Sequence, residues 1–335
     1  MRAALLTAGE RVEVTCAHRR IGRILEEGAA NLWTSPDGSA PDVRVRVEHT
    51  SEPFDTAGWE VLTRDAWRLP GRVVVRDACS SGLDVLVTAT GTTLDVAARW
   101  RPPLKARAAA SVLRARSQLL IRAVLLQYPA LWWAQQRGRV PLHASVCTVG
   151  SPVGPAVLIA GPGGVGKSTL VNAELARGAR STTDNLCVSD GRTAWGVLEP
   201  RRVPADDPST TGGRRMPHGR REAAWPSRVD LLAPDLVVVL RRGSAPAATA
   251  SPCPSEQAVK ALVAGTYMAG ELRRYWAFAA TLALGTGLGD IQPAVEQVAR
   301  TFADKLPTLE VVLGDRPGTP LAGLIPDRAD AGVKP

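Results

Sequence analysis

The chain has 335 residues, of which 45% are hydrophobic, and a formal net charge of +9 at pH 7. This apolar content excludes an intrinsically disordered chain, and the length suffices for one large domain or two smaller ones. The positive charge comes mainly from arginine, but no nucleic-acid-binding motif accompanies it, so we expect no nucleic-acid partner.

The cysteines and the apolar segments indicate where the protein works. The five cysteines lie far apart and include no C-x-x-C pair, which predicts free thiols in a reducing compartment. The first 14 residues contain no apolar core of signal-peptide length. The most apolar helix candidates, 119–134 and 275–284, are too short or too interrupted to span a membrane. We therefore expect a cytoplasmic protein without a membrane partner.

Residues 1–104 predict a small β-rich N-terminal domain. Residues 42–48 alternate apolar and polar side chains with the period of a half-buried strand. Strands at 72–76, 83–90 and 93–99 follow, separated by short turn segments, which is typical of an antiparallel meander. The domain is either a substrate-recognition module or a scaffold that completes the core.

Residues 105–138 predict a helical connection. Residues 108–126 contain few helix breakers, and Pro129 is placed to open a second short helix that ends at Gly138. From 139 to 314 strands and helices alternate, which predicts a second, α/β domain. The last stretch, 315–335, is rich in proline and glycine and predicts a flexible tail.

The most informative segment is the run G-P-G-G-V-G-K-S-T at 161–169. An apolar strand is predicted before it at 156–160 and a helix after it at 170–177, which is the context that a phosphate-binding loop requires. Backbone amides of such a loop hold phosphates, its lysine reaches the β- and γ-phosphates, and its serine ligates Mg²⁺. The predicted residues that bind ATP are Gly161, Gly163, Gly164, Val165, Gly166, Lys167, Ser168 and Thr169.

Phosphoryl transfer also needs a carboxylate, both for Mg²⁺ and as a base for the acceptor hydroxyl. The apolar strand predicted at 236–240 ends in Arg241 and Arg242, which suit phosphate rather than metal. The nearest acid is Asp184, at the end of the strand predicted after the loop helix. The alternative role for Asp184 is a turn residue before the hairpin 185–199, whose own turn is Asp190-Gly191. His143 starts the strand before the loop strand, and by itself a lone histidine is more often structural.

Taken together, these segments resemble the catalytic domain of HPr kinase/phosphorylase, a member of the phosphoenolpyruvate-carboxykinase-like P-loop group. The match consists of Leu-His-Ala at 142–144, the strand and phosphate loop at 157–170, and Thr-Asp-Asn at 183–185. It implies an α/β fold with a mixed sheet, preceded by the smaller β-rich domain. The layout of 1–104 is closer to the shorter, divergent kinases of this group that phosphorylate precursor peptides in natural-product clusters.

The resemblance also implies roles for single residues. Lys167 would clamp the phosphates, Ser168 would bind Mg²⁺, and Asp184 would be the catalytic base, with His143 near the base or the γ-phosphate. Asn185 replaces the second acid of the family's Asp-Asp pair, so reverse phosphorylase activity is not expected. Proteins of this fold often form rings, which suggests a homo-oligomer.

The expected function is an ATP- and Mg²⁺-dependent kinase that phosphorylates a serine or threonine hydroxyl of a peptide or small protein. A small-molecule or sugar kinase, and a nucleotide-binding regulatory ATPase without an acceptor, remain alternatives. The arginine-rich stretch 200–226 predicts a mobile loop. Such a loop would either close over the phosphates, hold an acidic peptide, or be a solvated insertion.

Overall fold

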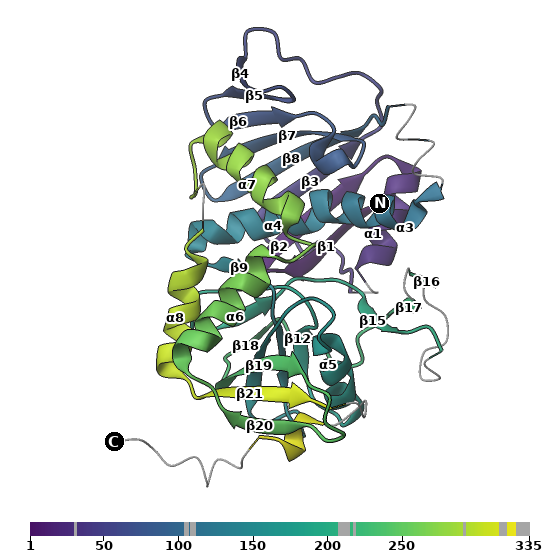
Figure 1. Cartoon of the computed structure of the whole chain (residues 1–335). Coiled ribbons are helices and arrows are strands. Elements are labelled where there is room, and N and C mark those ends of the chain that lie inside the picture. Colours follow the sequence, from purple (N-terminus) through teal and green to yellow (C-terminus); the bar gives the residue numbers. More distant parts are fainter. Residues whose placement is uncertain are drawn as a thin grey trace. The chain divides into compact units, whose positions relative to one another are not determined.

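The computed structural model describes residues 1–29, 32–103, 107, 112–206, 215–216, 219–290, 293–314 and 320–325. The protein is mixed α/β and forms two compact units (Figure 1). Unit 1 comprises Met1–Val140, Val197–Ala224 and Glu271–Pro293, and unit 2 comprises Pro141–Gly196, Trp225–Gly270 and Ala294–Pro335. The first boundary, after Val140, lies close to the expected one at 138, whereas the units have no boundary at 104 or 314 and the chain returns twice to unit 1 after leaving it. Among the described residues, no helix has the length and apolarity that crossing a membrane requires.

Unit 1 contains an eight-stranded sheet in the order β1-β2-β3-β8-β7-β6-β5-β4. Its strands are β1 (Arg2–Thr7), β2 (Glu10–Cys16), β3 (Val43–Glu48), β4 (Glu60–Thr63), β5 (Ala66–Leu69), β6 (Arg72–Val75), β7 (Leu83–Thr90) and β8 (Thr93–Trp100). The predicted antiparallel meander is confirmed from β6 to β8, and β4 and β5, which the sequence pattern did not indicate, extend it. The sheet as a whole is mixed, because β3 pairs in parallel with both β2 and β8. The helix α1 (Arg19–Gly28) supplies the crossover that the parallel β2–β3 pair needs.

Helices pack against this sheet (Figure 1). The described part of the helical connection begins with α3 (Arg114–Arg122), continues through a π-helical turn (Ala123–Gln127) and ends with α4 (Tyr128–Ala134). The first residues of the helix predicted at 108–126 lie outside the described residues. α4 contacts β2, β3 and β8, whereas α7 (Arg273–Thr286) contacts β4 to β7. A Cβ on Gly285 would lie 2.7 Å from the Val73 Cβ, so this glycine allows α7 to approach β6 closely.

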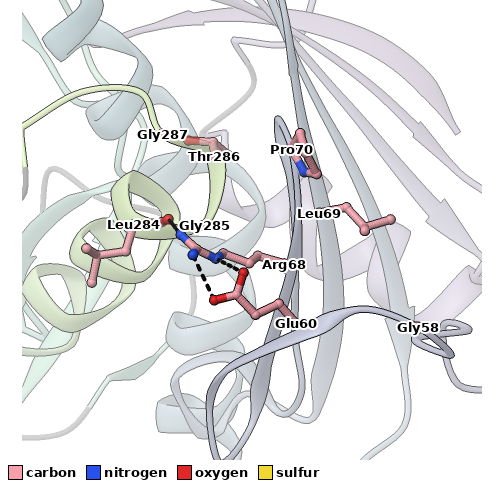
Figure 2. A pocket seen from close by; sticks show the side chains of 9 residues that line it. All are labelled: Gly58, Glu60, Arg68, Leu69, Pro70, Leu284, Gly285, Thr286 and Gly287. Atoms are coloured by element: carbon pink, nitrogen blue, oxygen red, sulfur yellow. Dashed lines mark hydrogen bonds and ion pairs between the residues drawn. The ribbon is translucent and has the colours of Figure 1, made fainter.

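The end of α7 is linked to the edge hairpin β4–β5 by one arginine. The Arg68 guanidinium donates two hydrogen bonds to the Glu60 carboxylate, at 2.8 and 2.9 Å, and a third to the Leu284 carbonyl at 3.1 Å. Figure 2 shows these contacts at one side of a cavity of about 330 Å³. Because the carboxylate neutralises Arg68 and the carbonyl belongs to the last helical turn, we assign this contact to stability.

The arginine-rich stretch 200–226 was predicted as an irregular mobile loop, and this was wrong for its described part. It forms a three-stranded sheet of β15 (Arg201–Pro204), β17 (Arg220–Ala223) and β16 (Arg215–Met216) within unit 1. The Arg122 side chain, only 3% exposed, donates to Glu222 of β17 at 2.7 Å. A buried ion pair thus holds this sheet to α3, and residues 207–214 and 217–218 lie outside the described residues.

Unit 2 is built on a six-stranded sheet in the order β12-β10-β11-β19-β21-β20. Its strands are β10 (Ser145–Thr148), β11 (Ala156–Ala160), β12 (Ser181–Thr183), β19 (Leu236–Arg242), β20 (Thr249–Pro252) and β21 (Thr308–Leu313). Val157 and Ile159 of β11 share a core cluster with Leu170 and Val171 of α5 (Lys167–Ala176). Because neighbouring strand residues face opposite sides, Leu158 points to the other face, where α6 (Ser255–Tyr267) contacts β11 and β19. α8 (Val295–Lys305) packs on α6.

Three further predictions concern unit 2. The helix expected at 258–283 is instead two helices, α6 and α7, which end and begin on either side of Gly270 and belong to different units. The hairpin at 185–199 is confirmed as β13 (Cys187–Ser189) and β14 (Ala194–Gly196), in the sheet β18-β14-β13-β9 with β18 (Leu231–Leu232) and β9 (Val140–Leu142). In the expected tail, Leu321 is fully buried in the core, so residues 320–325 are part of the folded unit, and 326–335 lie outside the described residues.

Candidate active site

The predicted strand, glycine loop and helix are confirmed, and the helix begins within the motif itself, at Lys167. Gly161 turns the chain out of β11 at φ 154°, and a Cβ there would lie 2.9 Å from the Leu240 carbonyl oxygen. This position therefore requires glycine. Val165 is buried in the core below the loop, while Gly163, Gly164 and Thr169 are exposed. The loop is thus anchored by one apolar side chain and presents Gly163 and Gly164 to solvent, where a ligand can reach them.

Lys167 lies across the loop and is only 5% exposed. Its Nζ donates hydrogen bonds to the Gly161 carbonyl at 2.8 Å and to the Pro162 carbonyl at 3.2 Å. Lys167 is also the first residue of α5, so its ammonium and the N-terminal end of this helix lie together at the loop. Both features favour an anion at the loop.

The sheet topology brings the other predicted residues to the same edge as the loop. β10 lies between β11 and β12 and is antiparallel to both. The start of β10 therefore lies at the same edge as the ends of β11 and β12. His143 precedes β10, Gly161 follows β11 and Asp184 follows β12, so all three meet there.

Asp184 is 2% exposed, and its backbone is fastened to both neighbouring segments. Its carbonyl oxygen accepts hydrogen bonds from Ser145 Oγ at 2.6 Å and from Ser168 Oγ at 3.2 Å. The phosphate-loop serine and the acidic residue are thus in direct contact. Ser145 was missed by the sequence reasoning; its one signal was its position directly after Leu-His-Ala.

His143 lies between β9 and β10 rather than at the start of a strand, and it is buried among three segments. Its Nδ1 is 3.1 Å from the Gly265 carbonyl, its Nε2 is 3.2 Å from Asn185 Oδ1, and its backbone N–H donates to Thr266 Oγ1 at 3.1 Å. A carbonyl only accepts, so Nδ1 carries a proton. Two arrangements then fit the contact of Nε2 with Asn185. Either the ring is an imidazolium and Nε2 donates to Asn185 Oδ1, or the Asn185 amide is rotated by 180° and its NH₂ donates to a neutral Nε2. No motif indicated Gly265 or Thr266.

The two arginines at the end of β19 differ in their surroundings. Arg242 Nε donates to the Val165 carbonyl of the phosphate loop at 3.3 Å. Arg241 instead pairs with Glu310 on the adjacent strand β21, at 3.2 Å. Successive residues of a strand point to opposite faces, so only Arg242 contacts the loop.

The oxygen atoms available at this edge of the sheet are of the kind that hard cations prefer as ligands. Ser168 Oγ and the Asp184 carboxylate are oxygen ligands, and Mg²⁺ prefers a few protein oxygens completed by phosphate and water. The described residues include no group of three or more His, Cys, Asp or Glu side chains placed to hold a metal ion. Ser168 and Asp184 alone are too few to enclose a metal ion, so any Mg²⁺ held by them would need phosphate and water oxygens as its remaining ligands.

A comparison of the chain with protein-family models and with curated protein sequences finds no match. The geometry of this sheet edge is accordingly the basis of the functional argument below.

Proposed function

We propose that this chain is an ATP- and Mg²⁺-dependent kinase, related in fold to HPr kinase, that phosphorylates a serine or threonine hydroxyl of a peptide or small protein. One observation carries the proposal. The glycine loop with Lys167 and Ser168, the buried residue Asp184 and the imidazole of His143 meet at one edge of a single sheet, where Ser168 contacts the Asp184 backbone. A nucleotide-binding loop alone would support binding, whereas the nearby buried acid and histidine support transfer.

The chemistry assigns a separate task to each residue. The loop amides bind the phosphates of ATP, and Lys167 exchanges its two carbonyl partners for phosphate oxygens. Asp184 accepts the proton of the acceptor hydroxyl as the hydroxyl oxygen forms its bond to the γ-phosphorus. The bond from the γ-phosphorus to the bridging oxygen breaks, and its electron pair leaves with ADP. His143 orients Asn185 next to this carboxylate through the contact at 3.2 Å.

Mg²⁺ would be held by Ser168 and Asp184, and when bound it neutralises charge on the phosphates. The contact between Ser168 Oγ and the Asp184 backbone supports this pairing of ligands, since it keeps the two residues together. Asn185 replaces a second carboxylate with a neutral amide, which supports a forward kinase more than a reversible enzyme.

The test is transfer of label from γ-labelled ATP, with Mg²⁺, to a set of serine-containing peptides. We expect labelled peptide serine with the wild-type chain and at least a hundredfold loss with Asp184→Asn, because the base and one Mg²⁺ ligand are lost while the loop amides and Lys167 remain to bind ATP. Asp190→Asn, in the exposed turn of the β13–β14 hairpin, is the matched control and should retain activity. Normal transfer by Asp184→Asn at unchanged ATP affinity would refute the assignment of the base.

A second pair of variants tests the nucleotide site. Lys167→Ala should lose ATP binding, whereas Lys260→Ala, on the exposed side of α6, should not. If both variants bind ATP equally, the proposed site is wrong. Label recovered on a sugar or metabolite would indicate a small-molecule kinase, and label recovered only as free phosphate would indicate a regulatory ATPase.

A further inference from the structure

Unit 1 holds a second concave site, which the proposed kinase chemistry does not use. A pocket of about 240 Å³ opens between the loop before β7, the end of β8 and the starts of α3 and α7. We call it the arginine pocket. Its lining residues are Ser80, Ser81, Gly82, Trp100, Pro102, Leu113, Arg116, Ser117, Leu120 and Arg274. Pockets for drug-sized ligands begin at about 300 Å³, so this one has room for a single chemical group and its neighbours.

Two cations in this pocket are uncompensated. Within the described part of the chain, neither the Arg116 nor the Arg274 guanidinium forms an ion pair or a side-chain hydrogen bond. The cavity in Figure 2 provides the contrast, because its arginine is neutralised by Glu60. Burial raises the pKa of the nearby Cys79 thiol to about 12, so this thiol stays neutral and leaves the charge of Arg274 in place.

The loop that forms one wall of the pocket is held in an unusual conformation. Asp77, Cys79 and Ser80 all have positive φ, at 41°, 57° and 61°, although none is glycine. Strained backbone of this kind persists only where surrounding contacts enforce it, and it clusters at ligand sites. The Asp77 carboxylate accepts from the Gly82 N–H at 2.8 Å.

Further contacts fasten the same loop to its neighbours. Ser81 Oγ donates to the Ala78 carbonyl at 2.7 Å, and Cys79 Sγ donates to the Arg274 carbonyl at 3.8 Å. A Cβ on Gly82 would lie 2.7 Å from Pro102 Cβ, so the loop also approaches the opposite wall closely. This wall of the pocket is therefore held in place by contacts within the protein.

The lining defines the chemistry of a ligand. Two guanidiniums match the charge of about −1.5 to −2 on a phosphomonoester at pH 7. Ser80 and Ser117 also line the pocket, and a serine hydroxyl can donate to a phosphate oxygen. The pocket is also lined by the apolar side chains of Trp100, Pro102 and Leu120. These can pack against the side chains that flank a phosphorylated residue in a peptide, whereas they add no binding energy for inorganic phosphate. We propose that the arginine pocket binds a phosphomonoester group carried by a peptide, such as a phosphoserine side chain.

The test measures binding in the absence of ATP, so its outcome is independent of the proposed kinase activity. A short peptide with one phosphoserine between leucines is titrated into the full chain by calorimetry, alongside the unphosphorylated peptide and inorganic phosphate. We expect the phosphopeptide to bind at least tenfold more tightly than either. Equal binding of inorganic phosphate would overturn the peptide assignment, and absence of phosphopeptide binding would overturn the site.

Variants locate the binding. Arg116→Gln and Arg274→Gln should each weaken phosphopeptide binding by about tenfold, the effect of losing one charge-assisted contact. Arg114→Gln and Arg273→Gln are matched controls on the same helices, exposed and outside the pocket lining, and should bind as wild type. Lys167→Ala should also retain binding, because it alters only the phosphate loop. Loss of binding in Lys167→Ala, or equal loss in the controls, would refute the proposal.

Discussion

Replacing Gly161 by alanine is expected to deform the phosphate loop, and the structure sets the size of the effect. At φ 154° an alanine is strained, which costs about 1–3 kcal/mol. Its Cβ would also lie 2.9 Å from the Leu240 carbonyl oxygen. That oxygen belongs to the backbone of a central strand and cannot rotate away, so overpacking adds about 1–3 kcal/mol. The free energy of the native loop conformation should therefore rise by about 2–6 kcal/mol relative to alternative conformations.

Gly163→Ala is the matched control, because no heavy atom lies within 4 Å of a Cβ at that position and its φ is not positive. Calorimetric titration with Mg-ATP should show affinity at least about thirtyfold lower for Gly161→Ala than for Gly163→Ala, as a 2 kcal/mol conformational penalty requires. Hydrogen exchange should be faster in β11 and at the start of α5 for Gly161→Ala alone. Equal ATP affinity and equal exchange in the two variants would refute the loop geometry described above.

Three buried charged groups give further expectations, each measured by denaturant or thermal unfolding. Glu174 is fully buried, and its carboxylate accepts hydrogen bonds from two backbone N–H groups. Glu174→Ala should therefore lower the unfolding free energy by about 2–4 kcal/mol, and Glu174→Gln should lower it less. Equal losses in the two variants would contradict the role of these hydrogen bonds. Glu222→Ala should cost about 3–5 kcal/mol by leaving Arg122 buried without its main partner, whereas replacing both residues by methionine should be nearly neutral. Burial raises the pKa of Glu10 from 4.5 to about 7 despite two neighbouring arginines. The folded state then binds this proton more tightly than the unfolded state, so the unfolding free energy should fall between pH 4.5 and 7, by up to roughly 3 kcal/mol. Glu10→Gln should flatten that slope, and an unchanged slope would exclude Glu10 as its source.

The parts of the site that could be predicted from the sequence are those that local sequence encodes. The apolar run of β11, the glycines after it and the helix after them are adjacent in the chain, and each has a recognisable local pattern. The hairpin around Asp190-Gly191 was predictable for the same reason, since its loop, residues 190–193, is closed locally by the Asp190 carboxylate, which accepts from the Arg192 and Thr193 N–H groups.

Other features could not be predicted, because they depend on contacts between distant segments. The arginine-rich stretch has the composition of a loop, yet its described part forms a three-stranded sheet. Glu222 of this sheet makes a buried ion pair with Arg122, which lies 100 residues away in sequence. The helical pattern at 258–283 gave no sign that the chain passes between units near Gly270. β3 likewise pairs in parallel with β2, which precedes it in the chain, and with β8, which follows four strands later, so its own sequence does not reveal its neighbours.

By itself, the amino-acid sequence determined that this protein carries a glycine-rich loop between a buried strand and a helix, the pattern of a phosphate-binding loop. Backbone conformation at glycine and the periodicity of apolar residues act over a few positions, so local sequence suffices for this conclusion. Only the tertiary structure decided which residues surround the loop. The antiparallel insertion of β10 brings His143 and Asp184 to one edge, and the Gly265 carbonyl, 122 residues from His143, orients the imidazole. Such contacts arise because the sheet buries each strand against others, and no local pattern records which strands become neighbours.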